Sequence, residues 1–149
     1  MRLLCYNETI STYHMGATVK VLIEGYTNAD AVAERGEEVA RPTITLVRDG
    51  DLVMVVDPGN VKSQQDLLDA LAAEHLTLDE VTMVCITHSH LDHYRNVALF
   101  PKAKVLEYYG LWDNDVFEEW PGQFSPYIQV LKTPGHDGTS ITLIVQTDE

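Results

Sequence analysis

The chain has 149 residues, and 23 acidic residues against 10 lysines and arginines give it a formal net charge of −13. Apolar residues make up 45% of the sequence, which is typical of a globular domain and excludes a disordered chain. The acidic balance disfavours nucleic acid as a partner, because binding through a basic surface requires positive charge. We therefore interpret residues 1–149 as a single globular domain.

Neither a membrane span nor a secretion signal is visible in the sequence. The apolar runs, such as residues 52–56, are far shorter than the roughly 20 residues that a spanning helix needs. The N-terminal segment turns polar without an apolar core, so we expect a soluble cytoplasmic protein without membrane contact. Cys5 and Cys85 are too few for a disulfide framework, and Cys85 is predicted to be a small buried residue.

The first half of the chain begins with predicted strands. Residues 18–25 alternate apolar and polar side chains and predict a strand, whereas the charged residues 26–42 predict a surface loop or insertion. Two β-rich runs, 43–47 and 52–56, flank an Asp-Gly pair and predict a hairpin. The Asp-Pro-Gly sequence at 57–59 ends the second of these strands.

Residues 63–75 predict the clearest helix. Ser63 can cap it, Asp66 lies where a capping box needs an acceptor, and leucines follow at helical spacing. The apolar residues 81–87 then predict a buried strand. This helix between two strands predicts a βαβ unit.

Further short strands are predicted at 104–107, 128–132 and 140–146, and the aromatic and acidic residues 108–126 are predicted as a loop. The fold class is therefore α/β or α+β with a mixed sheet.

Four of the six histidines fall in two short segments, each directly after a predicted strand. His88 and His90 are two residues apart in an extended segment, so their side chains can converge on one point. His136 follows another strand and could complete three facing ligands. Three histidines and one open position are typical of a catalytic zinc site, and no cysteine lies near either segment to close a structural site. The alternative is a solvated turn that happens to be rich in histidine.

At these residues the sequence resembles the metallo-β-lactamase superfamily. Residues 88–93 (His-Ser-His-Leu-Asp-His) fit the hallmark of that family, and residues 133–136 match its downstream histidine segment. Residues 55–59 match the strand-end Asp-x-Gly that precedes the hallmark in many members. The resemblance covers residues 18–146, and residues 21–26 resemble one subgroup of small members. It implies an αββα sandwich built from two similar halves.

The resemblance also implies roles for particular residues. The first metal would be bound by three histidines: His88, His90 and His136. Asp92 and His93 would bind a second metal, and Asp92 would also orient the attacking water as a catalytic residue. Asp57 would hydrogen-bond a ligand histidine, because a ligating imidazole needs its other N–H fixed. The alternative for Asp57 is a simple turn residue.

Two positions depart from the family pattern near the ligands. Arg95 stands where the family usually has glycine, and could narrow the site or hold an anionic substrate, or be a solvated side chain. Asp137 stands where many members have a hydroxyl residue, and is either another acceptor beside a ligand or a turn residue.

The C-terminal residues also differ from the family pattern. The family's bridging aspartate and last histidine have no counterpart before Glu149, and we do not assign Asp148 to the bridge. We therefore expect the chain to lack the C-terminal part of the fold and to bind one metal, or two if another chain donates groups. The uncovered sheet face would favour a homo-oligomer.

The function that the resemblance implies is a metal-dependent hydrolase acting on a small-molecule substrate. Zinc is the expected metal, with iron or manganese as alternatives. Its bound hydroxide would attack an ester, thioester, lactone or related bond. The alternatives are a non-catalytic metal-binding fragment or subunit of a larger assembly, and a phosphodiesterase or nuclease of the same fold.

Other conspicuous residues lie outside the motifs. His14 and His75 are interpreted as ordinary histidines, His75 at the end of a helix. Trp112, Phe117 and Trp120 could wall a substrate pocket or simply pack a long loop.

Overall fold

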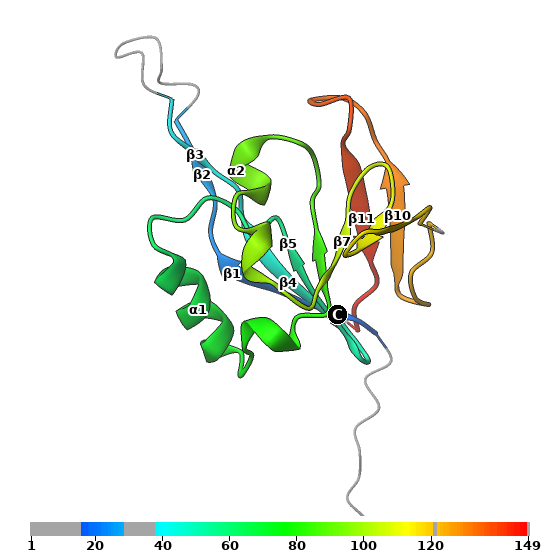
Figure 1. Ribbon diagram of the computed structural model, residues 1–149, viewed down its shortest axis with the longest axis horizontal. Coiled ribbons are helices and arrows are strands. Elements are labelled where there is room, and N and C mark those ends of the chain that lie inside the picture. Colours follow the sequence, from blue (N-terminus) through cyan, green and yellow to red (C-terminus); the bar gives the residue numbers. More distant parts are fainter. Residues whose placement is uncertain (1–15, 29–37, 121, 149) are drawn as a thin grey trace, which may run out of the picture.

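A seven-stranded mixed sheet is the centre of the computed structural model, which describes residues 16–28, 38–120 and 122–148. Its strand order is β1-β4-β5-β6-β7-β8-β9, and two further pairs, β2–β3 and β10–β11, form small separate sheets (Figure 1). The strands are β1 (Thr18–Ile23), β2 (Tyr26–Thr27), β3 (Ala40–Arg41), β4 (Ile44–Asp49), β5 (Leu52–Val56), β6 (Met83–Cys85), β7 (Lys104–Leu106), β8 (Leu111–Asp113), β9 (Val116–Glu118), β10 (Ile128–Lys132) and β11 (Ile141–Val145). The helices are α1 (Gln64–Ala73) and α2 (Leu91–Tyr94), with 3-10 turns at Leu78–Glu80 and Val97–Leu99.

The predicted hairpin and βαβ unit are both present. β4 and β5 pair antiparallel around Gly50, whose φ of +56° is a conformation that glycine adopts without steric cost. β5 then connects through α1 to β6, which pairs parallel with β5, and β7 pairs parallel with β6. Parallel pairing brings the carboxyl ends of β5 and β6 to the same edge of the sheet, where Val56 lies opposite Cys85.

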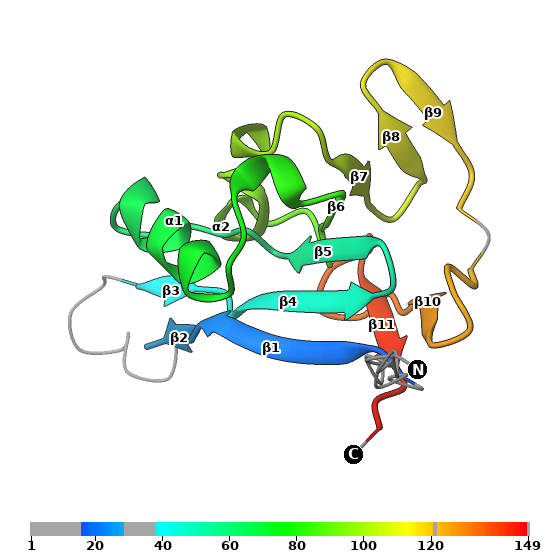
Figure 2. The ribbon, with the colours of Figure 1, turned by 90° about the horizontal axis from the view of Figure 1, so that it is seen from below.

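The two faces of the large sheet pack against different layers. α1 covers one face, where Leu67 and Leu71 are fully buried beside Val55 and Val84. The β10–β11 pair packs toward the other face, where Ile128 and other residues of that pair join the cluster that contains Met54 (Figure 2). Burial on both faces explains why the central strands are continuous apolar runs rather than alternating ones.

Helix α1 begins with the predicted capping box. Ser63 Oγ accepts a hydrogen bond from the Gln65 backbone N–H at 3.1 Å, and Asp66 Oδ2 accepts one from the Ser63 N–H at 3.3 Å. At 10 residues, α1 is much too short to cross a bilayer. No helix within residues 16–28, 38–120 and 122–148 is long and apolar enough to span a membrane.

Two predicted loops are wrong in part. Within residues 26–42, β2 pairs with β3, and Tyr26 lies opposite Arg41; residues 29–37 lie outside the described part of the chain. Within residues 108–126, β8 and β9 form a hairpin whose turn residue Asn114 has a φ of +54°. Both pairs were missed because their strands have two or three mostly exposed residues, which produce no recognisable period.

Replacing the helix cap tests the local stability of α1. We expect Ser63→Ala to lower the free energy of unfolding by about 1 kcal/mol, because the Gln65 N–H loses its acceptor. Ser63→Asp keeps an acceptor at this position and is the matched control. Urea unfolding followed by circular dichroism measures both, and equal stability of the two variants would contradict the assigned cap.

Candidate metal centre

Three loops that carry polar side chains meet at one edge of the large sheet. Asp57 directly follows β5, and Thr87 and His88 follow β6, whose parallel register brings the two strand ends together. The connection from β10 to β11 carries His136, and it is joined to the same edge because the Ile141 N–H donates to the Thr87 carbonyl at 2.8 Å. The sheet topology therefore gathers residues that are far apart in the sequence.

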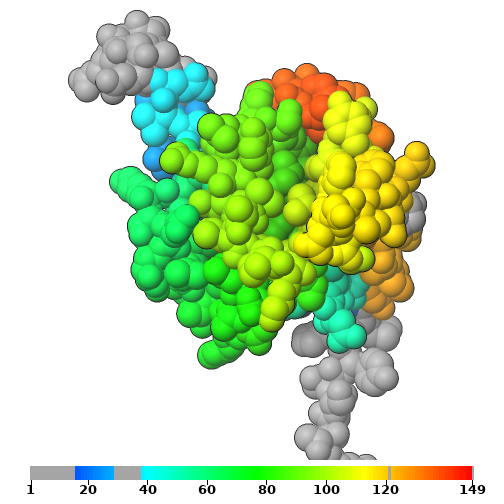
Figure 3. Space-filling model, viewed as in Figure 1, coloured from blue at the N-terminus to red at the C-terminus, as the bar shows by residue number. Residues whose placement is uncertain are grey.

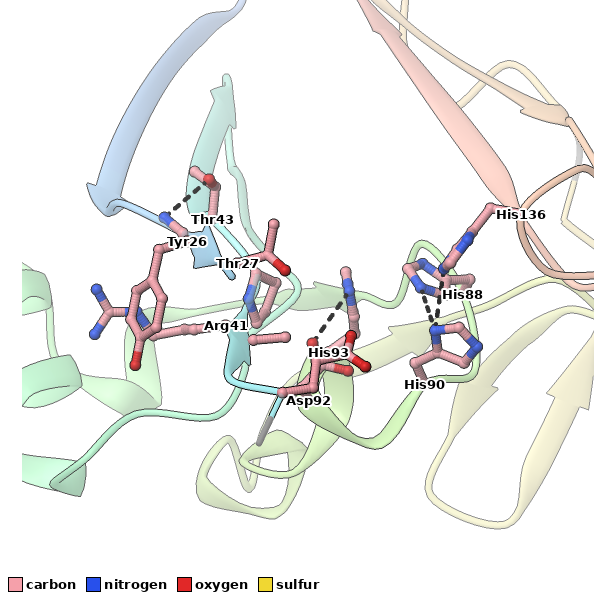
Figure 4. A pocket seen from close by; sticks show the side chains of 13 residues that line it. Tyr26, Thr27, Arg41, Thr43, His88, His90, Asp92, His93 and His136 are labelled. Atoms are coloured by element: carbon pink, nitrogen blue, oxygen red, sulfur yellow. Dashed lines mark hydrogen bonds and ion pairs between the residues drawn. The ribbon is translucent and has the colours of Figure 1, made fainter. Parts of the chain in front are cut away.

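The predicted histidine triad is brought together. His88, His90 and His136 each offer a ring nitrogen, and these three nitrogens all lie within 4.8 Å of one another. His90 Nδ1 lies 3.2 Å from His88 Nε2 and also 3.2 Å from His136 Nε2 (Figure 4). Tetrahedral zinc with Zn–N bonds of 2.0–2.1 Å needs ligand nitrogens about 3.4 Å apart. The donor set and its spacing therefore fit a metal ion.

The buried carboxylate of Asp57 organises the histidine segment from behind. Its Oδ1 accepts from the Thr87 backbone N–H at 2.8 Å, and its Oδ2 accepts from the Thr87 hydroxyl at 2.7 Å. Because that hydroxyl donates its only proton to Asp57, it accepts from His88 Nδ1, 3.2 Å away. This chain of hydrogen bonds leaves His88 Nε2 with its lone pair directed toward the other two histidines.

Asp92 and His93 lie on α2 at the margin of the triad. His93 Nδ1 is 2.8 Å from Asp57 Oδ2, and its Nε2 is 3.8 Å from Asp92 Oδ2. The His93 ring lies 3.9 Å from the His88 ring, measured between centroids. The histidine that Asp57 contacts directly is therefore His93, and His88 is reached through Thr87.

The pKa values of His88 and His93, whose rings lie side by side, are shifted in opposite directions. Burial, together with the neighbouring imidazoles, lowers the pKa of His88 below its ordinary value. Burial alone would also lower the pKa of His93, but the hydrogen bond and charge of Asp57 and the charge of Asp92 raise it. A neutral His88 keeps the lone pair that a metal ligand requires.

Cys85 is not one of the side chains that face the cavity. Cys85 is fully buried in the core below the sheet edge, as predicted. Burial and, to a smaller extent, the charge of Asp57 raise the pKa of the Cys85 thiol well above its usual range. It therefore stays protonated and cannot compete as a thiolate ligand.

A cavity of about 600 Å³ opens in front of the histidines. His88, His90, Asp92, His93 and His136 line one side. The other side, which we call the hairpin wall, consists of residues at the base of β2–β3: Gly25, Tyr26, Thr27, Glu38, Ala40, Arg41, Pro42 and Thr43 (Figure 4). In the space-filling view, the cyan part of the chain that includes β3 and the orange-red β10–β11 connection lie on either side of the green part (Figure 3).

The sequence did not predict that residues of the hairpin wall line the cavity. Arg41 closes its base, because Nε and Nη2 donate to the Glu24 carbonyl at 3.2 and 2.7 Å, and the guanidinium lies 4.8 Å from the Tyr26 ring centre. Gly25 was the one available signal. A Cβ there would lie 2.5 Å from the Thr43 nitrogen, so this close approach of two backbones requires glycine.

Several residues that the sequence offered as possible pocket residues are absent from the cavity lining. Arg95 donates to Asn60 Oδ1 at 3.3 Å and is absent from the lining. Trp112 and Phe117 pair across the β8–β9 hairpin, while Trp120 packs against the core. His75 lies in the exposed turn that follows α1, and His14 lies outside the described residues.

Residues 39–144 match the sequence profile of the metallo-beta-lactamase superfamily, which covers most of the chain and includes every residue of the triad. The chain therefore belongs to the metallo-beta-lactamase superfamily. It is 34% identical over 136 residues to metallo-beta-lactamase domain-containing protein 1 of Xenopus laevis, a match that covers 86% of this chain and 57% of that protein. That protein represents the subgroup that residues 21–26 resemble. The chain thus spans little more than half the length of this curated relative.

Solved structures share the fold. A candidate metallo-beta-lactamase from Thermotoga maritima superposes with a TM-score of 0.72 at 23% identity, covering 89% of this chain and 74% of that one. A protein from Staphylococcus aureus described as a probable metal-dependent hydrolase has a TM-score of 0.64 at 16% identity, covering 91% of this chain and 70% of that one. The mixed α/β architecture is therefore that of the metallo-β-lactamase fold, and this chain spans part of it, as the sequence predicted.

The hydrogen bonds of Asp57 should contribute measurably to the free energy of unfolding of the metal-free protein. We expect Asp57→Asn to lower the free energy of unfolding by about 2 kcal/mol, because two donors lose a buried charged acceptor. Asparagine tolerates the φ of +49° at this position, so backbone strain is unchanged. Thr87→Val removes one hydroxyl and should cost about 1 kcal/mol. Urea unfolding measures both, and wild-type stability in both variants would show that the network contributes nothing.

Proposed function

We propose that this protein is a metal-dependent hydrolase whose metal is held by His88, His90 and His136. The observation that carries the proposal is the convergence of three ring nitrogens at the side of a cavity of about 600 Å³. A structural zinc site normally takes four protein ligands, whereas three ligands facing a cavity leave a position for water or substrate. Zinc is the metal we favour for an all-imidazole donor set, with iron and manganese as alternatives.

A divalent metal held there would act as a Lewis acid and lower the pKa of a coordinated water toward about 7. The protein's own residues then have separate tasks. Asp92 lines the cavity beside the triad, where its carboxylate would orient the attacking water and accept its proton. Asp57 holds His93 through Nδ1, and His93 Nε2 lies 3.8 Å from Asp92 Oδ2, so these two residues would hold a second metal only if another chain donates further ligands.

The substrate class we propose is a small molecule with an ester, thioester, lactone or related bond. The cavity volume lies within the range of about 300–1,000 Å³ that small-molecule sites occupy. The net charge of −13 opposes the approach of a polyanion, which makes a nuclease the weaker candidate.

Metal content is the first test. Protein purified without added metal should contain about one zinc ion per chain by elemental mass spectrometry, because the triad supplies a complete catalytic-type ligand set. His88→Ala and His136→Ala should each lose this metal. His75→Asn removes a histidine outside the site and keeps a residue that tolerates the φ of +59° there, so it should retain the metal. Full metal content in both triad variants would refute the ligand assignment.

Catalysis is tested separately with p-nitrophenyl acetate, an acyl thioester and a simple lactone. We expect hydrolysis of at least one of them by zinc-loaded protein, and loss of that activity on treatment with a chelator. Asp92→Asn should reduce kcat by about 100-fold or more, since it removes the acceptor for the water proton, while the triad metal stays bound. Full metal occupancy without turnover of any of these substrates would instead favour a metal-binding protein with no catalytic role.

A further inference from the structure

We infer that Asp137 is a positioning residue for the metal centre, which fixes His90 and joins the two loops that carry the triad. The inference rests on the proposed metal-binding function and extends it. His90 differs from the other two histidines because it turns Nδ1 inward, so its outer nitrogen is Nε2. That nitrogen lies 3.7 Å from Asp137 Oδ2.

The carboxylate of Asp137 is itself held in place by its own loop. Oδ1 accepts a hydrogen bond from the Thr139 backbone N–H at 2.6 Å and is also within hydrogen-bond reach of the Thr139 hydroxyl. The Gly135 N–H donates to the Asp137 carbonyl at 3.1 Å, and the Ser140 hydroxyl donates to it at 3.0 Å. With Oδ1 occupied in this way, Oδ2 is the atom left to face His90.

The same carboxylate reaches the other ligand loop. Ser89, between His88 and His90 in sequence, has its hydroxyl 3.5 Å from Asp137 Oδ2 and 3.0 Å from the Thr139 hydroxyl. Asp137 and Thr139 belong to the connection from β10 to β11, whereas Ser89 follows β6. These contacts join segments about 50 residues apart in the sequence, one carrying His90 and the other His136.

A carboxylate on the outer nitrogen of a ligand histidine has a known physical effect. It fixes the tautomer, so that the proton sits on the outer nitrogen and the lone pair faces the metal. It also limits ring rotation, which lowers the entropic cost of gathering the ligands. His88 receives this support through the hydrogen bonds of Thr87 and Asp57, and Asp137, whose Oδ2 lies at an ion-pair distance of 3.7 Å, is the residue placed to give it to His90.

Zinc affinity of four variants, measured by competition with a chromophoric chelator, tests the inference. Asp137→Ala should weaken zinc binding about 10- to 100-fold, the usual effect of losing a partner behind a ligand histidine. Asp137→Asn keeps an acceptor oxygen and should recover most of this affinity. Thr139→Val removes a hydroxyl from the loop but leaves the carboxylate beside His90, so its loss should be much smaller. Asp115→Ala removes an exposed carboxylate from the β8–β9 hairpin and should bind as wild type does.

Two further measurements separate positioning from loop stability. Thermal unfolding of the metal-free variants should show similar losses for Asp137→Ala and Thr139→Val, while only the former changes the visible absorption of the cobalt-substituted protein. Equal zinc affinity and equal cobalt spectra for Asp137→Ala and wild type would overturn the inference with the triad intact. A wild-type protein that binds no zinc at all would instead overturn the proposed function.

Discussion

The buried contact between Asp57 and Thr87 is the interaction on which the site depends. It joins the ends of two parallel strands, and both oxygens of the carboxylate take part. From this one contact the orientation of His88 follows through the Thr87 hydroxyl, and that of His93 follows directly. The orientation of these two imidazole rings is therefore fixed by the positions of the strand ends, through hydrogen bonds, and does not depend on a rigid loop.

Most of the central fold could be predicted because its physical signals are local and strong. Burial on both faces makes β5 and β6 continuous apolar runs, and the capping box marks the start of α1. The β2–β3 and β8–β9 pairs carry no such signal. Their strands are too short for a hydrophobic period, and they are stabilised by pairing that is visible only once the chain has folded.

The candidate site could be predicted in composition but not in geometry. The spacing of His88 and His90 after a buried strand identifies them as a converging pair. Nothing in that spacing reveals that His90 turns Nδ1 inward, since this depends on where the β10–β11 connection places Asp137. The hairpin wall could not be predicted either, because the composition of its charged segment is that of an ordinary exposed loop. The close approach of two backbones at Gly25 is seen only in the structure.

The hairpin wall and the histidine triad come from separate stretches of the chain. Every histidine of the triad lies at residue 88 or beyond, whereas the wall consists of residues 25–27, 38 and 40–43. Within the wall, Arg41 donates two hydrogen bonds to the Glu24 carbonyl, so part of its support comes from the same stretch of chain. For the proposed enzyme, substitutions in the wall would change which molecules the cavity admits without replacing any histidine of the triad, a division that suits divergence toward new substrates.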